Sequence, residues 1–214
     1  MTIRRLRGYS QHHPTTGIPV ASGDAQHHNI VQNTTLATRL VVFAYAFPHK
    51  KTQDVILRLA ALGGVPLAVV AAPWEPLPIA TPSIRVKPRH ADLVHPAELC
   101  RAFGIEYHVV DHRSDTCLLL LDWLKPELGL IAGARLLPGA VLDYFRHGVV
   151  NMHPGLLPHV RGLDALQWSL YHEVPLGVTA HIVDAQVDAG WILERRLIDI
   201  HQDDTLVDLS LRLY

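Results

Sequence analysis

Leu40-Val-Val-Phe-Ala-Tyr-Ala-Phe47 is the stretch of sequence that decides the fold. Eight residues without polar alternation are typical of a β-strand that is covered on both faces. Apolar residues then recur at helical spacing over 52–62, with Thr52 as a candidate N-cap and Gly63-Gly64 as a candidate end. The stretch therefore predicts the first strand of a βα unit.

The alternation of strand and helix continues through the rest of the chain. Further strands are predicted at 65–72, 106–110, 128–132, 148–153, 177–183 and 191–200, and further helices at 96–104, 115–124, 139–145, 163–172 and 205–214. Such alternation implies βαβ units with right-handed crossovers. The predicted fold class is α/β, a mostly parallel twisted sheet of Rossmann-like type with helices on both faces.

Two segments lie outside this alternation. Residues 1–37 are polar without a sustained apolar period, so we expect an irregular N-terminal extension before one domain at 38–214. The prolines between 73 and 88 mark a long irregular connection and a candidate substrate edge.

Composition and charge exclude several classes of protein. The chain has 214 residues, of which 49% are hydrophobic and 18% charged, which is typical of a folded globular domain. Its 19 Lys and Arg against 20 Asp and Glu give no basic field for a nucleic-acid backbone. The two cysteines form no C-x-x-C pair, and we find neither a signal peptide nor an apolar run of membrane length. We expect a soluble, cytoplasmic protein.

Asn151 and His153 are the first candidate site residues. They are two apart on a predicted strand, so their side chains share a face, and Pro154 ends the strand. Ligands of open parallel sheets bind beyond the carboxyl ends of the strands. The pair alone also fits ordinary polar residues at a strand end.

The surrounding sequence supplies the context for this pair. Asn151-Met-His-Pro-Gly-Leu-Leu-Pro-His-Val-Arg-Gly162, then Gly177-Val-Thr-Ala-His-Ile-Val-Asp184 and Val187-Asp-Ala-Gly190, resembles the signature of the formyltransferases that use 10-formyltetrahydrofolate. The resemblance is close over 130–193 and implies a catalytic group of Asn151, His153 and Asp188.

The same resemblance implies where the folate co-substrate binds. Ala134-Arg-Leu-Leu-Pro138 resembles the segment whose backbone holds the pteridine ring, and Val183 to Asp188 resembles the loop that closes the pocket. The implied cofactor-binding residues are Arg135, Leu136, Leu137, Val183, Asp184 and Val187.

Formyl transfer gives each catalytic candidate a role. The tetrahedral intermediate carries an oxyanion, to which the Asn151 amide or a protonated His153 can donate. The attacking amine loses a proton and the leaving folate nitrogen gains one, for which imidazole is suited near neutral pH. Asp188 can favour the imidazolium and relay the proton. We expect no metal, because the histidines, 15 in all, show no ligand spacing. Alternatively, Asp188 and Gly190 form only a turn.

Absences narrow the acceptor within the family. The turn Phe47-Pro-His-Lys-Lys51 lacks the Gly- and Ser-rich phosphate-binding loop whose presence would make it resemble glycinamide ribonucleotide transformylases. A transfer-RNA formyltransferase would be expected to have a further domain and a basic surface. The sugar branch remains, with a dTDP-linked 4-amino-4,6-dideoxyhexose as acceptor, a homodimer and a role in glycan biosynthesis as expectations. Arg161, Lys87 and Arg89 are candidate substrate-binding residues.

Several alternatives stay open at this point. The domain could formylate glycinamide ribonucleotide, bind folate or a nucleotide sugar without turnover, or serve as a scaffold for a protein partner. Trp168 and Tyr171 could stack on a base, but their spacing favours core packing. Cys117 is expected to be a packed thiol.

Overall fold

The computed structural model describes residues 38–76 and 92–213, so the predicted N-terminal extension and most of the Pro-rich connection lie outside the described residues. The described strands are β1 (Leu40–Tyr45), β2 (Ala68–Ala72), β3 (Glu106–Val109), β4 (Leu128–Ile131), β5 (Val149–His153), β6 (Gly177–Ile182) and β7 (Ile192–Leu197). The described helices are α1 (Lys50–Ala61), α2 (Pro96–Phe103), α3 (Asp115–Leu124), α4 (Gly139–Leu142), α5 (Ala165–Tyr171) and α6 (Leu206–Leu213).

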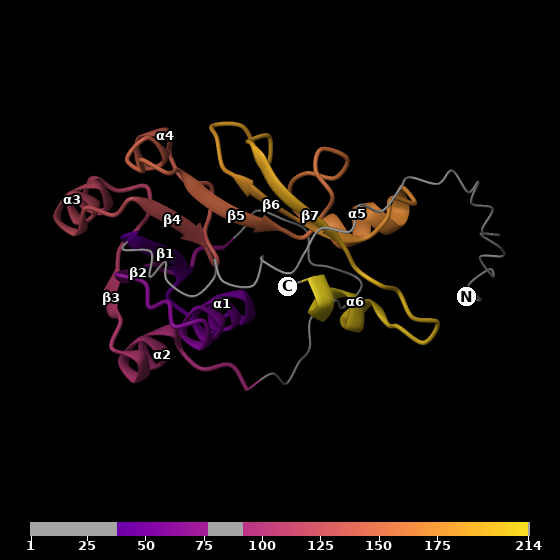
Figure 1. Cartoon of the computed structure of the whole chain (residues 1–214), viewed down its shortest axis with the longest axis horizontal. Helices are drawn as coiled ribbons and strands as arrows, with labels where there is room; N and C mark the ends of the chain where they lie inside the picture. Colours follow the sequence, from indigo (N-terminus) through magenta and orange to yellow (C-terminus); the bar gives the residue numbers. More distant parts are fainter. Residues whose placement is uncertain (1–37, 77–91, 214) are drawn as a thin grey trace, which may run out of the picture. The chain divides into compact units, whose positions relative to one another are not determined.

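The described strands form one sheet in the order β3-β2-β1-β4-β5-β6-β7 (Figure 1). The first five strands in sequence pair in parallel, whereas β6 pairs antiparallel with β5 and β7 antiparallel with β6. The mostly parallel α/β fold is therefore confirmed, with an antiparallel end that the strand pattern did not predict.

Both faces of the sheet are covered, as the apolar run in β1 predicts. Val41 and Phe43 join a cluster that includes residues of α3 and α4, whereas Val42 and Ala44 join a cluster with residues of α1 and α2. Figure 1 shows α1 and α2 together on one side of the strands and α4 on the other. Successive side chains of a strand point to opposite faces, so a strand that is apolar throughout needs both layers.

Helix α1 corrects one detail of the sequence prediction. The helix begins at Lys50, after an N-cap at His49, so Thr52 lies in its first turn and is not the cap. The buried Thr52 hydroxyl instead donates to the carbonyl oxygen of Ala132 at 2.8 Å. This bond ties the first turn of α1 to the residue that follows β4.

Helix α5 contradicts another prediction. Trp168 and Tyr171 are 49% and 77% exposed, so they do not pack in the core. The short helix buries Ala165, Leu166 and Ser169 instead. Cys117 is buried, as predicted.

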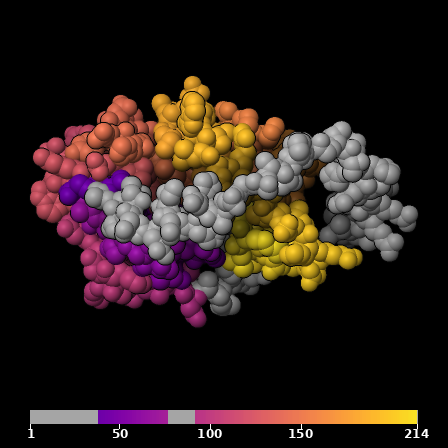
Figure 2. Space-filling view, in the orientation of Figure 1, coloured from indigo at the N-terminus to yellow at the C-terminus, as the bar shows by residue number. Residues whose placement is uncertain are grey.

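Strand β7 forms the edge of the sheet in the described residues. Five of its six residues are exposed, and Figure 2 shows the C-terminal part of the chain, in yellow, open at the surface. Over 38–76 and 92–213, no helix has both the length and the apolar character needed to cross a membrane.

Candidate active site

The pairing of β5 with β6 sets the frame of the site. Asn151 lies opposite His181, and His153 lies opposite Thr179. Residues two apart on a strand share a face, and paired residues of neighbouring strands lie side by side on it. The structure thus gathers an amide and two imidazoles on one face near the carboxyl end of β5.

His153 has an acceptor group beside each of its ring nitrogens. The ring is only 3% exposed; its Nε2 donates to the Val160 carbonyl oxygen at 2.9 Å, and its Nδ1 lies 3.3 Å from Asp188 Oδ2. Burial lowers the pKa of His153 below the usual value, against the opposing effects of Asp188 and the Val160 carbonyl. The imidazole therefore resists protonation more than a solvated histidine would.

Asp188 reaches this cluster from the loop between β6 and β7. Its backbone adopts a positive φ of 48°, its Oδ2 accepts from the Gly162 amide at 2.8 Å, and its Oδ1 lies 3.5 Å from His181 Nε2. Burial raises the pKa of this carboxyl, but the contacts with His181, Gly162 and His153 outweigh it and leave the pKa below the usual value. Asp188 is thus an anion that faces two imidazoles.

Gly190 explains how the loop can place Asp188 there. A Cβ atom at this position would lie 1.8 Å from the Ile182 carbonyl oxygen, far inside van der Waals contact. Only glycine allows the chain to pass so close to the end of β6. The Asp-Ala-Gly segment is therefore more than a polar turn, since its geometry delivers a carboxylate to His153.

A buried threonine fixes the segment that follows β5. The Thr179 hydroxyl donates to the Gly155 carbonyl oxygen at 2.7 Å and accepts from the Leu157 amide at 3.1 Å. Arg195 Nε donates to the Leu157 carbonyl oxygen at 2.8 Å, and the Leu157–Pro158 peptide bond is cis. These bonds hold the chain in the path that brings Val160 to His153.

Two site residues were missed by the sequence reasoning. Lys51 of α1 donates from Nζ to Asn151 Oδ1 at 3.1 Å, and His181 is fully buried with Nε2 3.3 Å from Asn151 Nδ2. The available signal for His181 was a histidine on a strand whose only other polar side chain is that of Thr179. Lys51 gave no such signal, because a lysine at the start of a helix is usually solvated.

The predicted folate-binding residues lie in the loops after β4 and β6, the strands on either side of β5. Leu136 and Val187 are 71% and 47% exposed, whereas the Leu137 side chain packs in the core and leaves only its backbone to a ligand. Asp184 accepts from the Gln186 amide, and the Val183 amide donates to the Val149 carbonyl oxygen.

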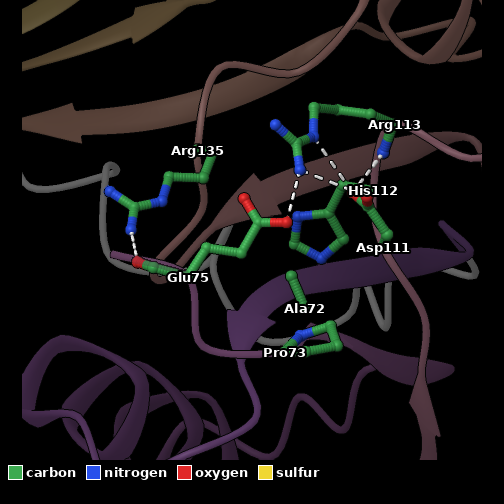
Figure 3. Close-up of a pocket in the computed structure, with 7 residues that line it drawn as sticks. All are labelled: Ala72, Pro73, Glu75, Asp111, His112, Arg113 and Arg135. Carbon is green, nitrogen blue, oxygen red and sulfur yellow. Dashed lines mark hydrogen bonds and ion pairs between the residues drawn. The ribbon is translucent and has the colours of Figure 1, made fainter. Parts of the chain in front are cut away.

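Arg135, the remaining residue of that set, lies beside a small pocket at the ends of β2 and β3. Figure 3 shows Glu75 between two guanidinium groups: Arg113 binds its carboxylate at 2.6 Å, and Arg135 binds its backbone carbonyl oxygen. The pocket encloses about 10 Å³, roughly the space of one water molecule.

Arg161 lies in a larger pocket of about 200 Å³ with His159, Val160, Trp168 and His172. The Trp168 and His172 rings are nearly parallel, with centroids 5.6 Å apart. Val160, whose carbonyl oxygen accepts from His153, also lines this pocket. Lys87 and Arg89 lie outside the described residues.

The cluster can do acid–base and hydrogen-bonding chemistry. It combines an ammonium group, an amide, two imidazoles and a carboxylate, each in contact with at least one other member of the cluster. Within the described residues, no group of three or more His, Cys, Asp and Glu side chains is arranged to hold a metal ion.

Comparison with known proteins identifies the family. The family model described as Formyl transferase matches residues 86–214, more than half of the chain, and this match includes every residue of the cluster except Lys51. The chain belongs to the formyl transferase family. In this formyl transferase chain, the match covers α2 to α6.

Curated relatives of this formyl transferase chain include methionyl-tRNA formyltransferases. That of Thermosynechococcus vestitus is 41% identical over 85 residues, which are 39% of this chain and 26% of the relative. That of Syntrophus aciditrophicus is 32% identical over 142 residues, which are 64% of this chain and 43% of the relative. The chain thus spans less than half the length of these relatives.

Solved structures share the fold. Glycinamide ribonucleotide transformylase 1 from Symbiobacterium toebii superimposes with a TM-score of 0.62 at 24% identity, covering 90% of this chain and 85% of that protein. A sugar N-formyltransferase from Shewanella sp FDAARGOS_354 gives a TM-score of 0.58 at 20% identity, covering 82% and 63%. At these identities the likeness supports the fold alone.

Proposed function

We propose that this protein transfers the formyl group of 10-formyltetrahydrofolate to an amine, with Asn151, His153 and Asp188 as its catalytic residues. The observation that carries the proposal is the contact between His153 Nδ1 and Asp188 Oδ2 at 3.3 Å, which joins β5 to a loop far along the chain. The family match over 86–214 supports the reaction class.

The proposed reaction needs the groups that the cluster offers. The amine nitrogen attacks the formyl carbon, its C–N bond forms, and the bond from that carbon to the folate nitrogen breaks. The amine loses one proton and the folate nitrogen gains one, so the products are a formamide and tetrahydrofolate. The Asn151 amide can donate to the oxyanion, and His153 with Asp188 can move the proton.

His153 has a further requirement in this scheme. Both of its ring nitrogens already face partners, Val160 and Asp188, and the ring is buried. Proton transfer with a substrate therefore requires the hydrogen bond to Val160 to break, since a ring nitrogen that donates to a carbonyl oxygen cannot at the same time exchange a proton with the amine. Catalytic hydrogen bonds often form only in the substrate complex.

The proposed folate site lies in the loops on either side of β5. The exposed Leu136 and Val187 side chains can offer apolar contact to a flat ring, and the Leu137 backbone and the Val183 carbonyl group can supply polar contacts. Arg135 and Asp184 complete the proposed set, and the Arg135 guanidinium is a group that can pair with a carboxylate.

For the acceptor we retain the amino group of a nucleotide-linked amino sugar, such as dTDP-4-amino-4,6-dideoxyhexose. The pocket beside Val160 supports this choice, because it combines an exposed indole with the Arg161 guanidinium. An aromatic ring can stack on a base, and a guanidinium can pair with a phosphate. The expected homodimer and role in glycan biosynthesis belong to this proposal, as do Lys87 and Arg89.

Methionyl-tRNA is a second candidate acceptor. It is favoured by the 41% identity to the Thermosynechococcus vestitus enzyme over 85 residues. Against it stands the net charge of −1, because a polynucleotide needs several phosphates neutralised at once.

The test is a formylation assay on the purified chain with 10-formyltetrahydrofolate and three acceptors. These are dTDP-4-amino-4,6-dideoxyglucose, methionyl-tRNA and glycinamide ribonucleotide, with products detected by mass spectrometry. His153→Ala is the site variant, and His147→Ala is the matched control, since His147 is exposed and precedes the same strand.

We expect formylated sugar nucleotide from the wild type and the control but not from His153→Ala. Formylation of methionyl-tRNA or glycinamide ribonucleotide alone would keep the reaction and replace the acceptor. Absence of any formylated product, with folate bound or not, would contradict the proposed activity of this chain.

A further inference from the structure

Lys51 joins the cluster from outside the segment that carries the family match. It lies in the first turn of α1, and its Nζ donates to Asn151 Oδ1 at 3.1 Å and to the Met152 carbonyl oxygen at 2.8 Å. Both acceptors belong to β5. The side chain therefore spans from the helix to the strand and binds the strand at the candidate catalytic residue.

We propose that Lys51 is a positioning residue that sets the orientation of the Asn151 amide for formyl transfer. The inference rests on the proposed function, because Asn151 matters only if it donates to the reacting carbonyl. It adds a residue to which neither the sequence pattern nor the family match assigns a role.

The two side chains differ in their hydrogen-bonding capacity. A lysine ammonium has donors only, whereas a side-chain amide has an oxygen that accepts and a nitrogen that donates. Lys51 can therefore bind Asn151 only through Oδ1. With the oxygen fixed toward α1, Nδ2 must point the other way, where it lies 3.3 Å from His181 Nε2.

The second proton of Asn151 Nδ2 is the one that matters for catalysis. One N–H can donate to His181 Nε2, and the other remains for the oxyanion of the tetrahedral intermediate. A flipped amide would turn its oxygen toward His181 and the reacting carbonyl, and two oxygens would then repel each other. A donor that is oriented in advance costs no reorganisation during reaction.

The protonation of Lys51 gives a way to test this assignment. Burial lowers the pKa of Lys51 to about 8, although the nearby Asp188 carboxylate favours the charged form. The titratable groups that act on it are Asp188 from the loop after β6 and His153 on β5. His181 on β6 lies one contact further away, beside Asp188 and Asn151. A lysine in this setting can lose its proton within the range in which proteins are assayed.

Lys50 provides a matched control. It is the same residue type in the same helical turn, but its Nζ pairs with Asp54 on the partly exposed side of α1. Lys50→Met removes a lysine from α1 without touching Asn151. Lys51→Met removes the same charge together with both bonds to β5.

The first test measures the contact without turnover. The Asn151 side-chain NH2 signal is followed by 15N–1H NMR between pH 6 and 10 and identified from its loss in Asn151→Asp. We expect it to titrate with a midpoint at about 8 in the wild type and Lys50→Met, but not in Lys51→Met. If the signal titrates in the same way in Lys51→Met as in the wild type, the proposal is overturned, even if the enzyme is active.

The second test measures formylation. We expect Lys51→Met to lower kcat by about 10- to 100-fold with little change in the KM for folate, because the donor is misdirected and not removed. In an Asn151→Ala background the same change should have almost no further effect. Equal losses in both backgrounds would mean that Lys51 acts on the substrate directly, which contradicts a positioning role.

Rescue gives an independent readout. Lys51→Cys treated with 2-bromoethylamine regains an ammonium group of nearly the same length, and both native thiols are buried with pKa values raised to about 11. We expect kcat to recover at least fivefold and to stay unchanged in wild type treated alike. No recovery after complete alkylation would contradict the proposal. If the NMR titration holds but no acceptor is formylated, only the proposed function fails.

Discussion

At the scale of single residues, Asp188 determines the charge of the site. Its carboxylate lies near the Gly162 amide, His153 and His181, and its pKa is held below the usual value despite burial. Without this anion His153 would lose the group that favours its protonated form.

We therefore expect Asp188→Asn to lower formyl transfer by about 100-fold or more and to lower the pKa of His153 further. NMR titration of the His153 ring proton and steady-state kinetics check both effects. Asp203→Asn, an exposed carboxylate elsewhere, is the control. An unchanged His153 titration would show that the contact with Asp188 does not exist in solution.

Lys51 is expected to favour activity but to lower the free energy of unfolding. Its pKa is lowered by burial to about 8, so the folded state disfavours the charged form at pH 7. This penalty is fully present below pH 8 and disappears as the pH rises toward the unfolded value of 10.5.

Lys51→Met should therefore raise the free energy of unfolding at pH 7 by about 1 kcal/mol, because a pKa shift of this size outweighs two lost hydrogen bonds. Urea denaturation at pH 7 and pH 10 measures the effect, and the gain should shrink at pH 10. A loss of stability at pH 7 would mean that the bonds to β5 outweigh the cost of burying the charge.

The sequence predicted part of this residue-level picture. Spacing indicated that Asn151 and His153 share a face, because strand periodicity is a local property. The catalytic roles of these residues and of Asp188 stay predictions. Lys51 and His181 were not identified, since their importance depends on contacts between α1, β5 and β6 that no local pattern records.

At the scale of elements, the loop between β6 and β7 depends on the closest backbone approach in the site. Gly190 passes the Ile182 carbonyl oxygen so tightly that a Cβ atom would lie 1.8 Å from it. The adjacent Ile182 amide donates to the Trp191 carbonyl oxygen at 2.8 Å, which joins the two strands at this point.

Gly190→Ala should destabilise the protein by about 2–4 kcal/mol and remove activity, because the loop must shift and carry Asp188 with it. Gly139→Ala is the control: a Cβ there meets nothing within 4 Å, and alanine in a helix should be neutral or stabilising. Thermal unfolding of both variants measures the change in stability, and steady-state kinetics measures the change in activity. A fully active Gly190→Ala would show that the loop adapts without moving Asp188.

The predicted elements match the structure best where caps are explicit. Helix α3 spans Asp115–Leu124 as predicted, with the Ser114 side chain accepting from the Cys117 amide. Helix α2 begins at Pro96 and ends before Gly104, which has a positive φ of 66°. Helix α4 and strand β7 are shorter than predicted, since neither has a sequence signal for its end.

At the scale of the whole molecule, buried histidines link stability to pH. Burial lowers the pKa of both His112 and His153 below the unfolded value of 6.5. His112 is 2% exposed, and its Nδ1 has no hydrogen-bond partner among the described residues. The contribution of the two neutral histidines to the free energy of unfolding is complete above pH 6.5 and is lost as the pH falls, because the unfolded chain binds protons at a higher pH than the folded chain does.

The free energy of unfolding, measured by urea denaturation, should therefore decrease from pH 6.5 toward pH 5, by up to about 1.4 kcal/mol per pH unit for each histidine. His112→Phe should make this decrease shallower, and replacing the exposed His147 by Phe should not. A decrease that is identical in wild type and His112→Phe would rule out a contribution from His112.

The α/β class was predictable because strands buried on both faces alternate with helices. The antiparallel direction of β6 and β7 was not, since a strand's apolar pattern is the same in either direction. Trp168 and Tyr171 were misassigned for a related reason. Helical spacing shows that residues share a face, but it does not show which face meets the core.

The pairing of β5 with β6 has one more consequence. Asn151 faces His181 and His153 faces Thr179, so the cluster and the segment that Thr179 fixes both depend on one alignment of two strands. A slip of one residue would turn His181 and Thr179 to the opposite face. A misaligned molecule would thus be inactive, and would not act on other substrates instead. The specific activity of a preparation would then measure its correctly folded fraction.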